Sequence, residues 1–212
     1  YSINTSYKWY DWFMDRLGFI RMLHIGRIMY NRNNNILKER FCLIKIIVRE
    51  ATEKDSKIIA SIGVASWQAA YRDIISDEYL NSLSVEGREK HIINSIANPT
   101  NRFAIAELDG EPVGMICFYP LSNDAHAKRE WEIKALYVLP QYWNKGIGRA
   151  LIQYAFQYMV ANKGEICNLW VLADNQNARK FYERMGMSFT GKEKTITIDD
   201  RCLIEVNYQI HL

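Results

Sequence analysis

The stretch LYVLPQYWNKGIGRALI, residues 136–152, decides the fold class. It contains the end of an apolar run, a loop with glycines at positions 146 and 148, and the start of the most regular helical pattern in the chain. Apolar residues recur there at intervals of three and four, as on one buried face of a helix: Ile147, Ala150, Leu151, Tyr154, Ala155, Tyr158 and Met159. A second apolar run follows at residues 166–172. The sequence therefore predicts a strand, a helix and a strand joined as a right-handed parallel crossover.

The flanking segments favour antiparallel strands around this crossover. Apolar runs at 103–108 and 113–119 are joined by Asp109 and Gly110, a strong hairpin signal. Further strands are expected at 44–50, 130–139, 189–198 and 203–210, and helices at 52–71, after Ser84, and at 178–185. The predicted fold class is α/β (α+β), with a mixed, mostly antiparallel sheet, one parallel β-α-β crossover and flanking helices.

The glycine loop has the character of an anion-binding site. Gly146 and Gly148 permit unusual φ values and close approach of a ligand to the backbone. The amides at the start of the following helix, at the positive end of its dipole, suit a phosphate or pyrophosphate. Leu151 stands where a dinucleotide fingerprint needs a third glycine, and the chain contains no P-loop string. A different phosphate-binding motif is therefore expected, with Lys145 and Arg149 adding positive charge.

Residues 1–43 differ in character from residues 44–212, which we expect to form one domain. Three interpretations of this N-terminal appendage stay open. It is a translated extension upstream of a start at Met29 or later, a helix that packs on the domain or on a second copy, or a basic aromatic helix on a membrane surface. Its apolar runs are too short for the ~18–20 residues of a membrane span.

Charge and cysteine content exclude several classes for the domain. The chain has a net charge of +3, but residues 1–47 carry +5 and residues 48–212 carry −2. A basic nucleic-acid-binding domain is therefore not expected. The four cysteines are far apart and form no C-x-x-C pair, so neither a zinc ribbon nor a disulfide scaffold is expected.

Two blocks resemble the GNAT (Gcn5-related) N-acetyltransferase superfamily. Residues 143–148, WNKGIG, are similar to its acetyl-CoA-binding motif Q/R-x-x-G-x-G/A, with Trp143 in place of Gln or Arg. Residues 175–186, NQNARKFYERMG, are similar to the pattern N-x-x-A-x-x-F-Y-x-x-x-G that follows the fifth strand of the family. The resemblance covers residues 44–212, and a third, softer match includes Trp67 to Tyr71 and Tyr79.

The resemblance implies attack of a primary amine on the thioester of acetyl-CoA, and it implies which residues act as acid and base and which bind the two substrates. Tyr182 matches the general acid of the family and Glu132 its general base, with Glu130 as the fallback; the alternatives are a core tyrosine and solvent-facing carboxylates. The expected acetyl-CoA-binding residues are Tyr137, Val138, Asn144, Lys145, Gly146, Ile147, Gly148, Arg149 and Asn175. Asn175 also suits a helix cap, and both roles are compatible. The acceptor is expected beside Trp67, Tyr71, Asp73 and Tyr79.

The sequence as a whole favours an acetyl-CoA-dependent N-acetyltransferase that acts on a small-molecule or peptide amine by direct transfer. The expected protein is cytoplasmic, uses no metal, binds neither nucleic acid nor membrane through its domain, and is compatible with a homodimer. The alternative is a catalytically silent CoA-binding sensor or interaction module with the same fold.

Overall fold

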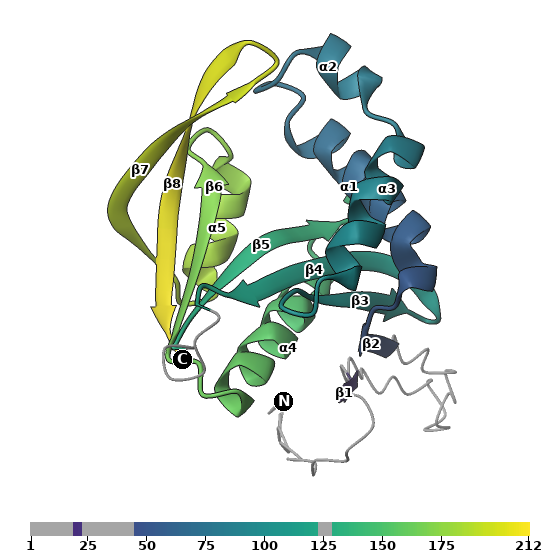
Figure 1. Cartoon of the computed structure of the whole chain (residues 1–212), viewed down its shortest axis with the longest axis vertical. Coiled ribbons are helices and arrows are strands. Elements are labelled where there is room, and N and C mark those ends of the chain that lie inside the picture. Colours follow the sequence, from purple (N-terminus) through teal and green to yellow (C-terminus); the bar gives the residue numbers. More distant parts are fainter. Residues whose placement is uncertain (1–18, 23–44, 123–128) are drawn as a thin grey trace, which may run out of the picture.

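The computed structural model describes residues 19–22, 45–122 and 129–212, whose strands form one sheet in the order β1-β2-β3-β4-β5-β6-β8-β7 (Figure 1). Every neighbouring pair is antiparallel except β5 and β6, so the predicted fold class is confirmed. The strands are β1 Phe19–Met22, β2 Lys45–Glu50, β3 Arg102–Leu108, β4 Glu111–Pro120, β5 Glu130–Val138, β6 Ile166–Leu172, β7 Ser188–Ile198 and β8 Arg201–His211. The helices are α1 Ser56–Ala70, α2 Asp77–Ser82, α3 Val85–Ala97, α4 Ile147–Ala161 and α5 Gln176–Arg184, with 3-10 turns at Glu53–Asp55 and Pro140–Tyr142.

Local sequence accounts for most element boundaries. The carboxylate of Asp55 accepts hydrogen bonds from the Thr52 amide at 2.8 Å and the Thr52 hydroxyl at 3.0 Å, so the chain enters α1 through a capped 3-10 turn. Asp109 and Gly110 both have positive φ, 52° and 91°, as the predicted β3–β4 hairpin requires. Helix α2 was not predicted, because six residues are too few to show a helical period.

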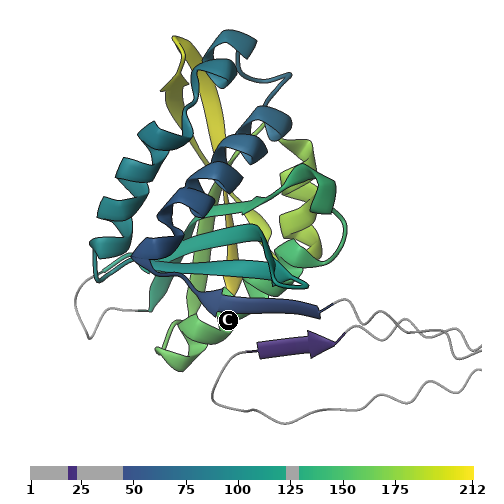
Figure 2. The same cartoon turned by 90° about the vertical axis from the view of Figure 1, so that its right-hand side faces the viewer.

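Helices lie on both faces of the sheet (Figure 2), and an apolar cluster is packed on each face. Helices α4 and α5 cover one face, where Phe118, Leu151 and Tyr182 belong to the larger cluster. Helices α1 and α3 cover the other face over β3, β4 and β5, where Ile62, Met115 and Tyr137 meet. This second face is called the α1 face below. It is the face on which the polar residues of the candidate site gather.

A β-bulge in β5 sets which side chains reach the α1 face. Cys117 and Phe118 are consecutive in β4, but their partners in β5 are Ala135 and Ile133, so Lys134 is the extra residue. Side chains alternate along a strand, so Glu132 and Tyr137, five residues apart, would face opposite sides of a regular strand. The bulge brings Glu132 onto the α1 face together with Tyr137.

The described part of the N-terminal appendage is a strand. Phe19–Met22 form β1, which pairs antiparallel with the free edge of β2, so the expected helix does not include these four residues. The other residues of 1–43 lie outside the described residues, and the three interpretations of the appendage, like the domain boundary, stay predictions. No helix in the described ranges combines the length and the apolar character needed to cross a membrane.

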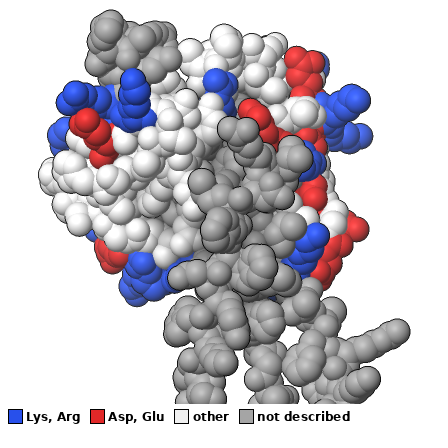
Figure 3. All heavy atoms as spheres, turned by 90° about the horizontal axis from the view of Figure 1, so that it is seen from below, with Lys and Arg blue, Asp and Glu red and all other residues white. Residues whose placement is uncertain are grey.

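Charged side chains are mixed in sign on the face that Figure 3 presents. Lys and Arg alternate there with Asp and Glu, and the described residues visible in this view form no broad basic patch. A domain that binds a nucleic-acid backbone usually gathers its basic residues on one face.

Candidate active site

The glycine loop leaves the start of α4 without a cap. Helices α2, α3 and α5 each begin with a side-chain cap, from Ser76, Ser84 and Asn175. The N-cap of α4 is Gly146, which has no side chain and adopts a left-handed φ of 85°. The first amides of α4 are therefore available to an anion, at the positive end of a helix of 15 residues.

The second glycine of the loop is explained by helix packing and not by the predicted backbone angle. Gly148 lies inside α4 and its φ is not positive, so the expectation of an unusual φ there is wrong. A Cβ on Gly148 would stand 3.1 Å from Cζ of Phe181, so the glycine allows α4 and α5 to approach closely. Ile147 is buried in the core, whereas Lys145 and Arg149 are exposed beside the loop.

Trp143, which departs from the family motif, anchors the loop. Its indole N–H donates to the carbonyl oxygen of Val138 at 2.7 Å. The hydroxyl of Ser66 in α1 donates to the same oxygen at 3.1 Å. Val138 thereby connects the end of β5, the glycine loop and α1.

Strands β5 and β6 pair only at one end. The parallel register runs from Glu130 opposite Ile166 to Ile133 opposite Leu169 and stops there, and the two strands diverge beyond it (Figure 1). Beyond Ile133, the register of β5 continues only with β4. The edge of β5 that carries Tyr137 and Val138 therefore has no strand partner among the described residues, and its backbone groups other than the Val138 carbonyl, which Trp143 and Ser66 already engage, are available to a ligand.

Three tyrosines from different elements converge beside this edge. The Trp67 indole N–H donates to the Tyr137 hydroxyl at 2.8 Å, and the rings of Trp67 and Tyr71 meet edge to face with centroids 5.0 Å apart. Burial raises the pKa of Tyr71 well above its usual range, and Tyr137 and Tyr182 raise it further. The Cζ atom of Arg88 in α3 lies over the Trp67 ring, 4.5 Å from its centroid. The structure thus brings the predicted residues Trp67 and Tyr71 together with Tyr137 and Tyr182.

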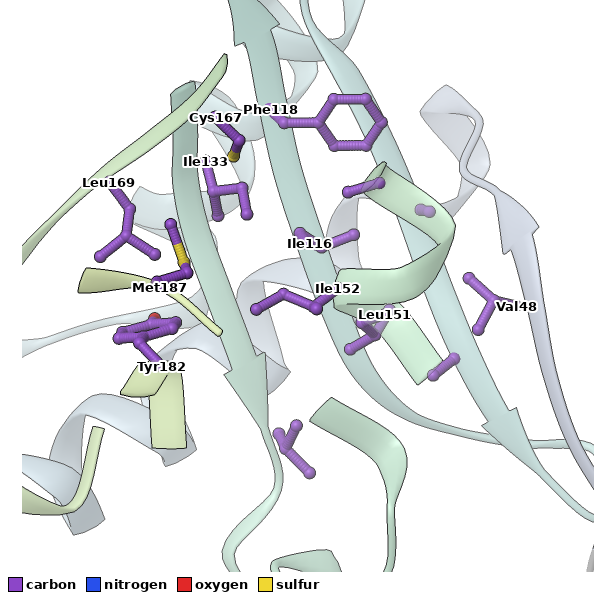
Figure 4. Packing of buried hydrophobic residues seen from close by; sticks show 14 of the residues in the cluster. Val48, Ile116, Phe118, Ile133, Leu151, Ile152, Cys167, Leu169, Tyr182 and Met187 are labelled. Carbon is purple, nitrogen blue, oxygen red and sulfur yellow. The ribbon is translucent and has the colours of Figure 1, made fainter. Parts of the chain in front are cut away.

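Tyr182 is suited to remain protonated. It is buried in α5 and lies beside Leu169 and Met187 (Figure 4). Burial raises its pKa well above the usual range, with Tyr137 and Cys167 adding to the rise. A phenol that is protonated at neutral pH has a proton to donate to a departing thiolate.

Glu132 lies across the sheet from Tyr182, on the α1 face. Its carboxylate accepts a hydrogen bond of 2.6 Å from the hydroxyl of Tyr119, its cross-strand neighbour in β4. In β6 its register partner is Asn168, whose amide donates to Glu130 at 3.5 Å. The sequence did not identify Tyr119 or Asn168, because only the bulge and the parallel register place them beside Glu132.

The remaining predicted residues divide into two groups. The Asn175 side chain accepts from the Ala178 amide at 3.1 Å, so it is the helix cap that the sequence allowed, and its side chain also opposes the rise in the pKa of Tyr71. Asp73 is exposed and Tyr79 partly exposed, and no described contact joins either side chain to the tyrosines. Within residues 45–122 and 129–212, no three His, Cys, Asp or Glu side chains are grouped so as to hold a metal ion.

This geometry can be compared with known proteins. Residues 67–187 match the model of the acetyltransferase (GNAT) family, and they include the glycine loop, both strands of the parallel pair and Tyr182. The chain belongs to the GNAT family. Its curated relatives include N-acetyltransferases, and proteins of the same fold have been solved with CoA and with acetyl-CoA.

Several relatives support this assignment. The N-acetyltransferase YuaI of Bacillus subtilis is 30% identical over 131 residues, covering 61% of this chain and 73% of the relative. A spermidine N(1)-acetyltransferase of Thermoplasma acidophilum is 29% identical over 149 residues, covering 68% and 88%. The structure of the PaiA N-acetyltransferase from Thermoplasma acidophilum with coenzyme A has a TM-score of 0.60 at 24% identity, covering 79% and 99%. That last likeness shows a shared fold.

Proposed function

We propose that this GNAT protein transfers the acetyl group of acetyl-CoA directly to a primary amine of a small molecule or peptide. The observation that carries the proposal is the divergence of β5 and β6 after Ile133 and Leu169. Tyr182 lies beside Leu169, the last paired residue of β6, on one face of the sheet (Figure 4), and Glu132, which precedes Ile133, lies on the other face. A thioester held between the diverging strands would thus have an acid on one side and a base on the other.

The uncapped start of α4 is the proposed pyrophosphate site. The amides that follow Gly146 would bind the phosphate oxygens, and the exposed side chains of Lys145 and Arg149 would add charge. Asn144, which also has a positive φ of 61°, completes the turn that presents these groups. The free edge of β5 at Tyr137 and Val138 would then hydrogen-bond the pantetheine arm and the thioester oxygen.

The proposed reaction is a single displacement. Glu132, directly or through a water molecule, takes a proton from the ammonium of the acceptor. The free amine nitrogen forms a bond to the thioester carbon, and the backbone amides of the β5 edge stabilise the resulting oxyanion. When the carbon–sulfur bond breaks, Tyr182 donates its proton to the departing thiolate; the nitrogen loses its second proton to solvent, and solvent reprotonates the tyrosinate. The acceptor would approach from the α1 face, past Trp67 and Tyr71.

A test follows from the buried position of Tyr182. The full chain is incubated with acetyl-CoA and a panel of amines and peptides that includes spermidine, and release of free thiol is measured. The variant Tyr182→Phe should reduce kcat about 100-fold, within the usual range for loss of a general acid, while CoA affinity changes less than threefold. An unchanged kcat would remove Tyr182 from the mechanism. Saturable CoA binding without transfer to any amine would favour the sensor alternative.

A further inference from the structure

On the α1 face, a lysine ammonium already lies against an aromatic ring and a carboxylate. The Nζ atom of Lys194 in β7 lies 4.2 Å from the ring centroid of Trp170 in β6. The same ammonium is 3.1 Å from a carboxylate oxygen of Glu205 in β8. Three neighbouring strands thus contribute one aromatic face, one carboxylate and one primary ammonium.

The strand register places this group beside the candidate site. Trp170 is two residues after Asn168 in β6, so both side chains face the same side, and Asn168 is the register partner of Glu132. Glu205 pairs with Leu172 on one side and with Lys194 on the other. Burial is the main cause of the raised pKa of Tyr71 and of Tyr137, and the Glu205 carboxylate adds to both, as a charge on the same side of the sheet would.

The three side chains differ in their freedom to move. The Glu205 side chain is 20% exposed, whereas that of Lys194 is 45% exposed. Trp170 is partly buried in the sheet. Lys194 is therefore the most exposed of the three, and it is the side chain that can move away into solvent and leave the indole and the carboxylate in place.

We propose that Trp170 and Glu205 form a subsite for a second ammonium group of the acceptor, and that Lys194 occupies this subsite when the acceptor is absent. The inference rests on the proposed function and gives its acceptor a class: a diamine or polyamine. One amine reacts as the free base near Glu132, and the other stays protonated on the indole and the carboxylate. An indole face with an adjacent carboxylate suits an alkylammonium through cation–π attraction and charge.

The experiment compares 1,4-diaminobutane with butylamine, which has the same length but lacks the second ammonium. The wild-type chain should acetylate the diamine with a kcat/KM at least tenfold higher. Glu205→Gln should raise the KM for the diamine about tenfold and change kcat less than twofold, with butylamine unaffected. Trp170→Leu should behave similarly, and Trp170→Phe should retain most of the affinity. Lys194→Met should lower the KM for the diamine several-fold, because an internal competitor has been removed.

Glu193→Gln is the matched control. Glu193 is exposed and pairs with Val206 of the core, so its side chain faces away from Trp170, and this variant should match the wild type with both amines. Urea denaturation checks that every variant is folded before kinetics are measured.

Several results would overturn the inference while leaving the acetyltransferase assignment intact. They are equal kcat/KM for the two amines, an unchanged diamine KM in Glu205→Gln and Trp170→Leu, or an increase in KM in Lys194→Met. Acetylation of Lys194 itself, detected by mass spectrometry, would make this lysine an acceptor rather than an occupant. Failure to acetylate any amine would instead overturn the proposed function, and this inference with it.

Discussion

Replacing Gly148 with alanine tests whether the second glycine of the loop serves packing or ligand approach. The added Cβ would stand 3.1 Å from Cζ and 3.3 Å from Cε2 of Phe181, whereas carbon atoms prefer about 3.5–4.0 Å. Overpacking of this kind costs about 1–3 kcal/mol, and the better helix propensity of alanine offsets up to about 1 kcal/mol. Because Phe181 is only partly buried, its ring can yield, so we expect Gly148→Ala to lower the free energy of unfolding by about 1 kcal/mol.

The measurement pairs this variant with a change in the ring that it meets. Urea denaturation gives the free energy of unfolding for the wild type, Gly148→Ala, Phe181→Leu and the double variant. Leucine removes the ring atoms that the new Cβ would contact, so the penalty of the alanine should disappear in the double variant, a coupling of about 1 kcal/mol. A fall in melting temperature of about 2–4 °C should accompany the single change.

The ring contact also connects this packing to catalysis. The centroids of Phe181 and Tyr182 are 5.4 Å apart, so a displaced Phe181 should disturb Tyr182 and lower kcat. CoA affinity, measured by calorimetry, should change less than threefold. If Gly148→Ala instead weakened CoA binding tenfold or more at unchanged stability, ligand approach rather than Phe181 would explain the glycine.

Three further predictions concern separate parts of the domain. Arg49 hydrogen-bonds the carboxyl of Asp55 and lowers its pKa from 3.8 to about 2. Asp55→Asn should therefore reduce the free energy of unfolding by roughly 1 kcal/mol above pH 4, a value that allows for screening of the partly exposed arginine by solvent. That difference in urea-measured stability should shrink as the pH falls through 2, and a constant difference would assign it to packing. Gly146 and Gly110 have positive φ values of 85° and 91°, so alanine at either position should cost roughly 1–2 kcal/mol of stability. Only Gly146→Ala should also weaken CoA binding, measured by calorimetry. Burial raises the pKa of Cys167 to about 12, so peptide mapping should find it unmodified by iodoacetamide at pH 8 until the protein is unfolded; rapid labelling of the native protein would contradict the described burial.

Much of the fold could be predicted because its signals are local. The period of residues 147–159 and the turn at Asp109 and Gly110 depend on neighbours in sequence, and both elements formed as expected. The sequence gives no local sign of the bulge at Lys134, since the extra residue is recognisable only against the register of β4. The short helix α2 was also not predicted, because its stability comes from the Ser76 cap and the burial of Leu80 and not from a helical period.

The candidate site was predicted only in part, for the same reason. The glycine loop and the block around Tyr182 are contiguous motifs, so they were found. The hydrogen bond from Trp67 to Tyr137 joins residues 70 apart in sequence, and the one from Tyr119 to Glu132 crosses two strands. Trp170 and Glu205 lie in apolar strand runs and carry no motif, and only the pairing of β6, β8 and β7 brings them together with Lys194.

The extra residue in β5 has a consequence for how sequences of this kind are aligned. Removing Lys134 would leave Ile133 and Ala135 adjacent, still opposite Phe118 and Cys117, so the strand would become regular and Glu132 would stay on the α1 face, one residue closer to Tyr137 in sequence. In a relative that lacks the insertion, the residue equivalent to Glu132 therefore stands one position closer to the glycine loop. Counting back from the glycine loop without checking for the bulge would assign the base to a residue that faces the core.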